Sequence, residues 1–172
     1  PLWVRISRST GKVRLWIIAM LGAALSYGGL FSLVFIEDQL TQMIVLVTLC
    51  ICSGAMSGCA NTLGPSVLGD IVDQDELVTG SRKEGAYFAL YNLADKSAHG
   101  VTIMIAGFVL SAVGFIPNTE QSFETKVALC GLLGLLPLFC YGVGAAMFTR
   151  FRLREQEHDE ILRALNARAS AH

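Results

Sequence analysis

The sequence has few charged residues. Asp, Glu, Lys and Arg make up 16% of its 172 residues, whereas about a quarter of the residues of a soluble domain are charged. Three long stretches contain no charge at all, namely residues 15–36, 39–69 and 127–149. Each is longer than the roughly 20 apolar residues that cross a bilayer core of about 30 Å, and buried helices of soluble proteins are usually much shorter. The scarcity of charge therefore excludes a soluble domain and indicates membrane-spanning helices.

The sequence also lacks the residue patterns of enzymes and metal sites. Its five cysteines fall inside the apolar stretches without the paired spacing that binds metal, and we interpret them as small packing residues. There is no nucleophile–base set, no phosphate-binding loop and no cluster of metal ligands. We therefore predict no enzymatic activity, no metal, no cofactor and no nucleic-acid partner.

The apolar stretches predict an all-α membrane protein with four transmembrane helices. A further stretch, residues 85–116, is also long enough to span a bilayer although it contains Asp95, Lys96 and His99. The four spans form one bundle within residues 1–149 and are expected at about residues 13–36, 41–68, 85–115 and 127–148. Residues 150–172 are predicted to form an amphipathic cytoplasmic tail, because Ile161, Leu162 and Leu165 share one helical face.

Lysine and arginine are distributed unevenly among the segments between the spans. Eleven of the 13 lie before the first span, between the second and third, or after the fourth. Basic residues are retained in the cytoplasm during insertion, so we expect both termini there and a multi-pass protein of the plasma (inner) membrane. The basic residues 1–14 lead directly into a span, from which we expect this sequence to be the C-terminal part of a longer transporter.

The third predicted span carries polar residues at helical spacing. Five of them fall within an arc of about 120°, namely Asn92, Asp95, Lys96, His99 and Thr102. An ion in the bilayer costs at least ~2.5 kcal/mol and is usually functional. Lys96 lies about 16 Å along its helix from Gly85, close to the midplane where transporters hold their substrates. Three roles remain open for Lys96: neutralising a carboxylate in a cation site, binding a hydroxylated substrate, or pairing structurally with Asp95 or a partner helix.

A charged segment, residues 70–84, connects the second and third spans. It contains five acidic residues close to Arg82 and Lys83. One interpretation is a solvated amphipathic helix. The other is a cytoplasmic gate, in which Asp70, Asp73 and Arg82 exchange ion pairs as the bundle opens and closes.

Two segments resemble a known family of transporters. The run GPSVLGDIVDQDELVTGSRKEGAYFALYNLADK, residues 64–96, and the run GFIPNTEQS, residues 114–122, are similar to the glycoside–pentoside–hexuronide:cation symporters. These are the melibiose-permease-like branch of the major facilitator superfamily. The resemblance implies a twelve-helix sugar symporter working by alternating access, of which this chain supplies helices nine to twelve. It also implies that the coupling cation, Na⁺ or H⁺, binds to N-terminal helices absent from this sequence.

The resemblance assigns roles to individual residues. Lys96 matches the functionally important lysine of helix eleven, and Asp95 precedes it in the polar stripe. Tyr91 and Asn92 match positions near the sugar, and Asn61 matches a position where melibiose permease has a sugar-stacking tryptophan. Asp70, Asp73 and Arg82 match the cytoplasmic gating network. Asparagine does not stack on a pyranose, and Gln74 replaces the usual aromatic residue after Asp73, which puts melibiose itself in doubt.

Two other interpretations are compatible with four spans. A four-span protein could form an oligomeric small-molecule exporter, but such exporters usually have a membrane carboxylate in their first span, and this one has none. A non-transporting membrane interaction module would leave the polar stripe unexplained. Within the transporter interpretation, lipid is an alternative substrate. The partners we expect are a sugar, the missing N-terminal helices of the same protein and the lipid bilayer.

Overall fold

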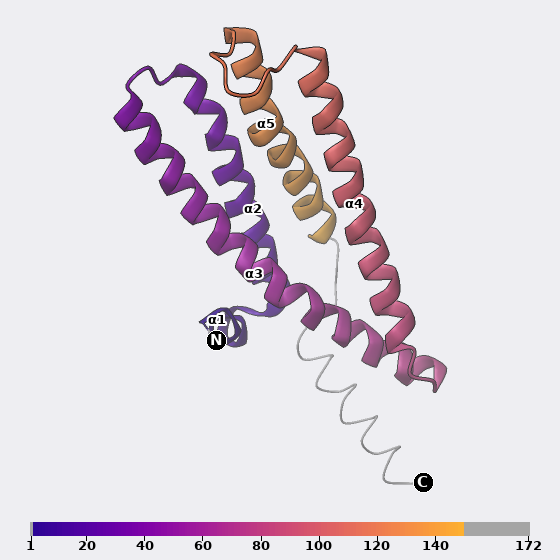
Figure 1. The fold of residues 1–172 in the computed structure, drawn as a ribbon. Coiled ribbons are helices and arrows are strands. Elements are labelled where there is room, and N and C mark those ends of the chain that lie inside the picture. Colours follow the sequence, from indigo (N-terminus) through magenta and orange to yellow (C-terminus); the bar gives the residue numbers. More distant parts are fainter. Residues whose placement is uncertain (1, 150–172) are drawn as a thin grey trace.

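The computed structural model describes residues 2–149 as a bundle of helices (Figure 1). Four of them are long and apolar enough to cross a membrane, which confirms the predicted all-α, four-span architecture. The predicted tail, residues 150–172, lies outside the described residues. In chain order, the elements are α1 (Leu2–Thr10), α2 (Lys12–Leu30), the short 3₁₀ helix η1 (Phe31–Phe35), α3 (Gln39–Thr79), α4 (Glu84–Ala112) and α5 (Phe123–Phe148).

Helix α3 is much longer than the span predicted within it. It does not end at Leu68 but continues to Thr79, a total of 41 residues. At 1.5 Å per residue it measures about 60 Å, twice the thickness of a bilayer core. It ends where Gly80 adopts the left-handed backbone conformation, with φ of 72°, that glycine tolerates best. The charged segment is therefore mostly a helical extension of the second span beyond the membrane (Figure 1).

The core lies where α2 packs between α3 and α5. Leu15 and Ala19 of α2 are buried against Cys59 and Leu63 of α3, and two tryptophans, one isoleucine and one methionine pack around them. On the other side, α5 approaches α2 so closely that a Cβ atom at Gly134 would lie 3.0 Å from backbone atoms of α2 and η1. Close backbone contact at small residues is how helices associate in lipid.

Helix α4 stands apart from this core. None of its residues is buried, and it contacts the other helices near its two ends. At one end the Tyr91 hydroxyl lies against Gly64 of α3. At the other, the Thr125 hydroxyl of α5 donates a hydrogen bond of 3.1 Å to the Val113 carbonyl, directly after α4. Most of the circumference of α4 is therefore uncovered by residues 2–149.

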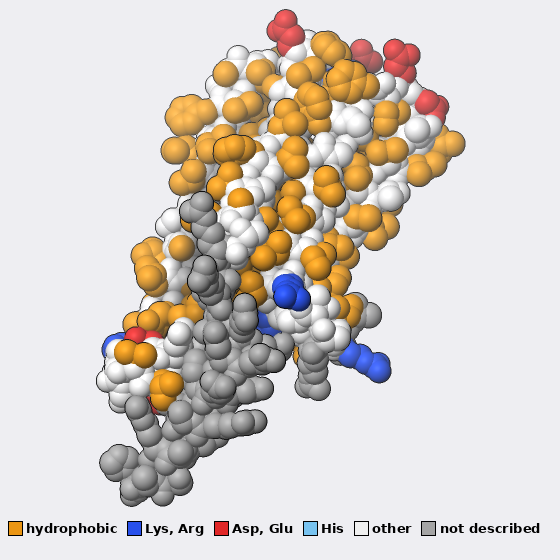
Figure 2. Space-filling view, turned by 180° about the vertical axis from the view of Figure 1, so that it is seen from behind, with side chains coloured by type: hydrophobic (Ala, Val, Ile, Leu, Met, Phe, Trp, Pro, Cys, Tyr) orange, Lys and Arg blue, Asp and Glu red, His pale blue; other side chains and the backbone are white. Residues whose placement is uncertain are grey.

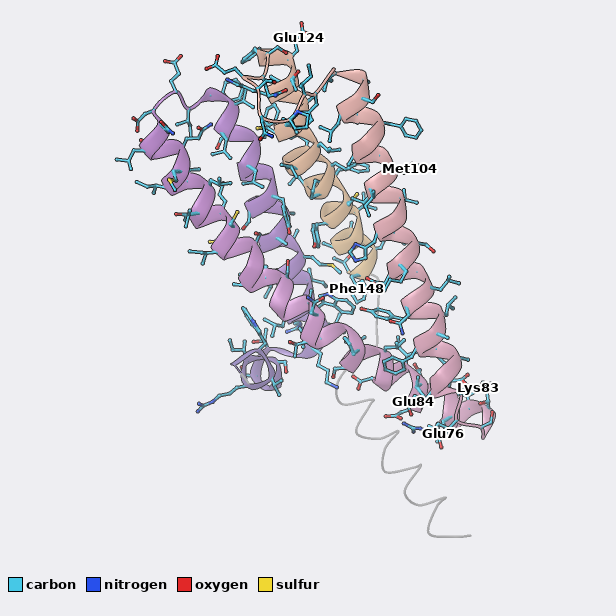
Figure 3. All side chains as sticks on the ribbon, viewed as in Figure 1. Glu76, Lys83, Glu84, Met104, Glu124 and Phe148 are labelled. Atoms are coloured by element: carbon cyan, nitrogen blue, oxygen red, sulfur yellow. The ribbon has the colours of Figure 1, made fainter. Side chains whose placement is uncertain are left out.

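The two ends of the bundle differ in charge. Figure 2 shows an apolar wall with acidic side chains at one end and both basic and acidic side chains at the other. Glu124 marks the first end, where α5 begins, and Lys83 lies at the far end, where α3 and α4 meet (Figure 3). The apolar wall between charged ends is the surface expected of a protein that spans a bilayer.

Candidate functional site

The predicted polar stripe lies along one flank of α4. The Lys96 ammonium is 3.6 Å from a carboxylate oxygen of Asp95, and His99 Nε2 is 3.7 Å from the other oxygen. These separations allow ion pairing but exceed ordinary hydrogen-bond lengths. The Lys96 side chain is 78% exposed. At the depth of a transmembrane helix such a charge needs protein or water around it, and residues 2–149 leave it largely uncovered.

Two further predicted residues lie where α3 and α4 cross. Tyr91 reaches from α4 toward Gly64, so that its hydroxyl would lie 3.1 Å from a Cβ atom there. Asn61 lies one helical turn earlier on α3 and is exposed. Pro65, four residues after Asn61, has no N–H, so the Asn61 carbonyl lacks its usual helical donor. The part of α3 one helical turn before the Tyr91 contact therefore offers an amide side chain and a carbonyl with spare hydrogen-bonding capacity.

The charged segment forms a compact ion-pair cluster around Arg82. Its guanidinium donates hydrogen bonds of 3.1 Å to Asp73, 2.8 Å to Glu76 and 3.1 Å to Glu84. Hydrogen bonds to Glu76 and then Glu84 raise the pKa of Arg82 above its ordinary value. The cluster joins the end of α3 to the start of α4 across the Gly80 turn, so it ties together the cytoplasmic ends predicted for these helices.

Asp70 lies apart from Arg82 and has a different partner. The Lys12 ammonium lies 2.8 Å from both of its carboxylate oxygens, and both side chains are mostly buried. This contact joins the first residue of α2 to α3. Sequence reasoning counted Lys12 only among the basic residues of the N-terminal segment, because no local pattern reports a contact between residues so far apart in the chain.

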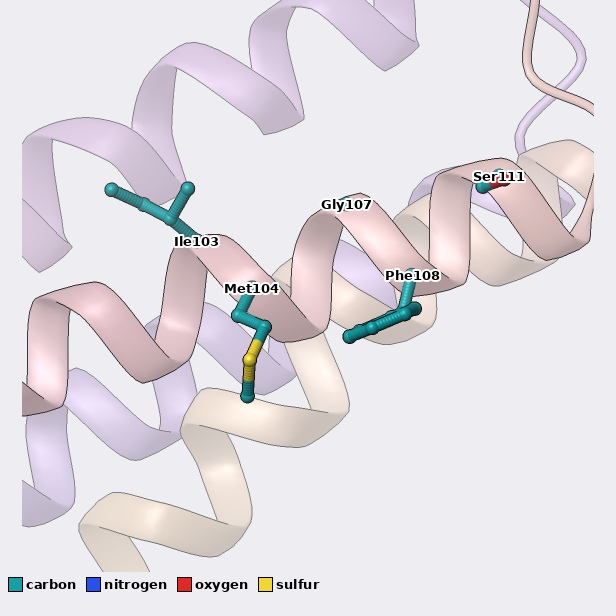
Figure 4. A pocket seen from close by; sticks show the side chains of 5 residues that line it. All are labelled: Ile103, Met104, Gly107, Phe108 and Ser111. Atoms are coloured by element: carbon teal, nitrogen blue, oxygen red, sulfur yellow. The ribbon is translucent and has the colours of Figure 1, made fainter.

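One hollow on α4 lies away from these residues. It has a volume of about 350 Å³ and is lined by Ile103, Met104, Gly107, Phe108 and Ser111 (Figure 4). It is open, mainly apolar and contains none of the predicted site residues. It therefore lacks the convergent polar groups that recognise a sugar. The candidate site consists of the α4 stripe, the Asn61–Tyr91 crossing and the two ion-pair groups.

Comparisons with known proteins identify the family of this chain. The family described as MFS/sugar transport protein matches residues 1–155. Similar proteins include an uncharacterized symporter, sll1374, of Synechocystis, 29% identical over 88% of this chain and 29% of its own length. Another is the uncharacterized symporter YjmB of Bacillus subtilis, 28% identical over 60% of this chain and 23% of its own length. A candidate sulfoquinovose importer of Salmonella typhimurium is 30% identical over 63% of this chain and 23% of its own length.

The chain spans about a quarter of the length of these relatives. No solved structure matches it. The family match covers the bundle, the stripe and the charged segment together, and it favours the transporter interpretation over an enzyme or an interaction module. The chain belongs to the MFS/sugar transport protein family, whose members are membrane transporters.

Proposed function

We propose that this chain is part of a sugar:cation symporter of the glycoside–pentoside–hexuronide type that works by alternating access. The observation that carries the proposal is the stripe on α4, which presents Lys96 at 78% exposure on a helix without buried residues. Such a stripe suits the wall of a polar cavity shared with further helices. The chain would supply helices nine to twelve of a twelve-helix protein, and its N-terminal helices would cover the stripe.

Some residues of the site would bind the sugar, and others would couple its binding to that of the ion. Asn92, Tyr91 and Asn61 offer hydrogen bonds to sugar hydroxyls. Lys96, with Asp95 beside it, would couple binding of the sugar to binding of Na⁺ or H⁺ in the N-terminal half. The name of the sulfoquinovose importer makes sulfonated sugars worth testing beside glycosides, pentosides and hexuronides.

The charged segment would act as the cytoplasmic gate. Asp70 and Asp73 are one helical turn apart on α3, so their side chains lie on similar faces. In the described state Lys12 holds Asp70 and Arg82 holds Asp73. Exchange of these partners would accompany opening and closing, with both termini cytoplasmic and the protein in the plasma (inner) membrane. A single exposed pair such as Arg82–Asp73 is worth only ~0–1 kcal/mol, which suits a reversible gate.

Transport by the complete protein tests the proposal. Lys96→Leu removes the charge near the midplane and should abolish accumulation of sugar against a gradient, with expression near the wild-type level. Lys126→Leu is the matched control, because that lysine lies near the start of α5, at the opposite end from the gate, and should leave accumulation unchanged. Wild-type accumulation by Lys96→Leu would leave the lysine a structural role only.

A further inference from the structure

The corner between α1 and α2 combines apolar packing with exposed basic side chains. Trp3 and Ile6 of α1 pack on the core between α2 and α3, while Arg5 is exposed. Lys12, at the start of α2, is held by Asp70. The short amphipathic α1 is thus fixed across the end of the bundle, where the membrane-spanning part of α2 begins (Figure 1).

A single exposed row runs from this corner along α2. Arg14, Ile18, Leu21 and Leu25 are all exposed, whereas the residues around them pack toward α3 or α5. The row extends from residue 14 to residue 25, a rise of about 16 Å over eleven steps of 1.5 Å. That is about half of a bilayer core of about 30 Å. One leaflet therefore contains the whole apolar part of the row, with Arg14 at its headgroup end.

The two arginines of this corner have no acidic partner within residues 2–149. Neither Arg5 nor Arg14 forms an ion pair with another residue in the described range 2–149, whereas Lys12 between them is paired at 2.8 Å. Basic side chains at the headgroup level attract anionic lipids. The corner thus combines unpaired positive charge with an apolar row of the length of one acyl chain.

The row fits a lipid chain better than another helix. Helix interfaces in membranes are rich in small residues that allow close approach, but this row contains only isoleucine and leucine below its arginine. The glycines of α2 that could receive a helix are already covered, Gly22 by Met56, Gly28 by Leu138 and Gly29 by Leu49. The exposed side chains of this row are therefore all large.

We propose that an anionic phospholipid binds at this corner. Its phosphate pairs with Arg14, the charge of Arg5 strengthens the attraction, and one acyl chain lies along Ile18, Leu21 and Leu25. The site is separate from the α4 stripe and does not depend on the transport function proposed above. Because it lies at the end of the bundle that carries the gate, the bound lipid belongs to the leaflet that faces the gate.

Native mass spectrometry of the complete purified protein tests this site with two lipids that share the same acyl chains, a phosphatidylglycerol and a phosphatidylcholine. The wild-type protein should retain phosphatidylglycerol preferentially. At about fivefold per arginine near the surface, Arg14→Gln should lower this retention about fivefold and Arg5→Gln/Arg14→Gln about 25-fold. Arg14→Lys should keep most of it. Lys126→Gln removes an exposed cation near the opposite end and should change nothing.

Two further measurements distinguish the occupants. Millimolar glycerol 3-phosphate should fail to displace the lipid, and a photo-crosslinker at position 21 should label lipid. The crosslinking measurement keeps both arginines, so it tests the site even if the arginine variants fail to fold. Equal retention of both lipids, an equal loss in Lys126→Gln, displacement by glycerol 3-phosphate, or crosslinks to another helix or a second copy would each overturn the proposal.

Discussion

Replacing Lys12 with methionine would remove the charge that ties the first residue of α2 to α3. Methionine keeps much of the length and apolar stem of lysine, so the change isolates the ammonium. That group lies 2.8 Å from both oxygens of Asp70, and the Lys12 and Asp70 side chains are only 25% and 14% exposed. The contact is therefore neither a surface pair nor a fully buried one.

The expected magnitude lies between those two limits. Exposed ion pairs are worth about 0.2–1 kcal/mol, whereas removing one partner of a buried pair costs about 3–5 kcal/mol. For this mostly buried pair we expect Lys12→Met to lower the free energy of unfolding by about 1–2 kcal/mol, guided by these limits. Combining it with Asp70→Asn should give a coupling energy of similar size, because the two side chains are in direct contact.

The assay is reversible unfolding of the complete protein in mixed micelles, followed by circular dichroism, for both single variants and the double variant. The control cycle uses Lys83 and Asp75, whose pair is longer at 3.3 Å and whose side chains are 48% and 20% exposed. It should give less than about 0.5 kcal/mol. A Lys12–Asp70 coupling energy no larger than that of the control would refute the reasoning that burial strengthens this tether.

Three further predictions address topology, packing and pH. A single cysteine at position 120, introduced into a cysteine-free background, should react with impermeant reagents from outside the cytoplasm; reaction from the cytoplasmic face alone would reverse the proposed orientation. Gly134→Val should lower the free energy of unfolding by about 1–3 kcal/mol, because the new side chain would meet backbone atoms of α2. The control is Gly131→Ala, because nothing lies within 4 Å of a Cβ atom at that position. Hydrogen bonds from the Thr41 side chain and N–H hold the pKa of Asp38 below its ordinary value. The cap therefore stabilises α3 fully above about pH 4 and loses its effect as pH falls through the lowered pKa; hydrogen exchange at the start of α3 should follow this dependence, and Asp38→Asn should abolish it.

The spans were predictable because apolar length is itself the physical requirement for crossing a bilayer. The end of α3 was not, because hydropathy reports where a helix leaves the membrane and not where its hydrogen bonds stop. Asp70 marks the loss of apolar character, yet helical structure continues to Thr79. The residue that ends it is Gly80, whose left-handed conformation becomes evident only in the structure.

The candidate site was predictable to the extent that it is local. The helical period placed Asn92, Lys96 and His99 on one flank of α4, and the structure leaves that flank exposed. Helical periodicity does not predict contacts between segments that are far apart in the sequence, and the Lys12–Asp70 pair is such a contact. The partner of Arg82 was partly predictable, since Asp73 pairs with it as the gate hypothesis requires, while Glu76 and Glu84 share the same guanidinium.

Helix α4 also has to enter the bilayer during synthesis, before any cavity exists to receive its charges. Asp95 and Lys96 add several kcal/mol to the free energy of its insertion, whereas α5 has no charge from Val127 to Phe148. Only residues 113–122 separate the two helices. The two helices therefore leave the ribosome in quick succession, and they can insert as a pair. The favourable free energy of inserting α5 then offsets the cost of the charges in α4. A nascent chain halted near residue 122 would insert α4 less completely than one extended through residue 149.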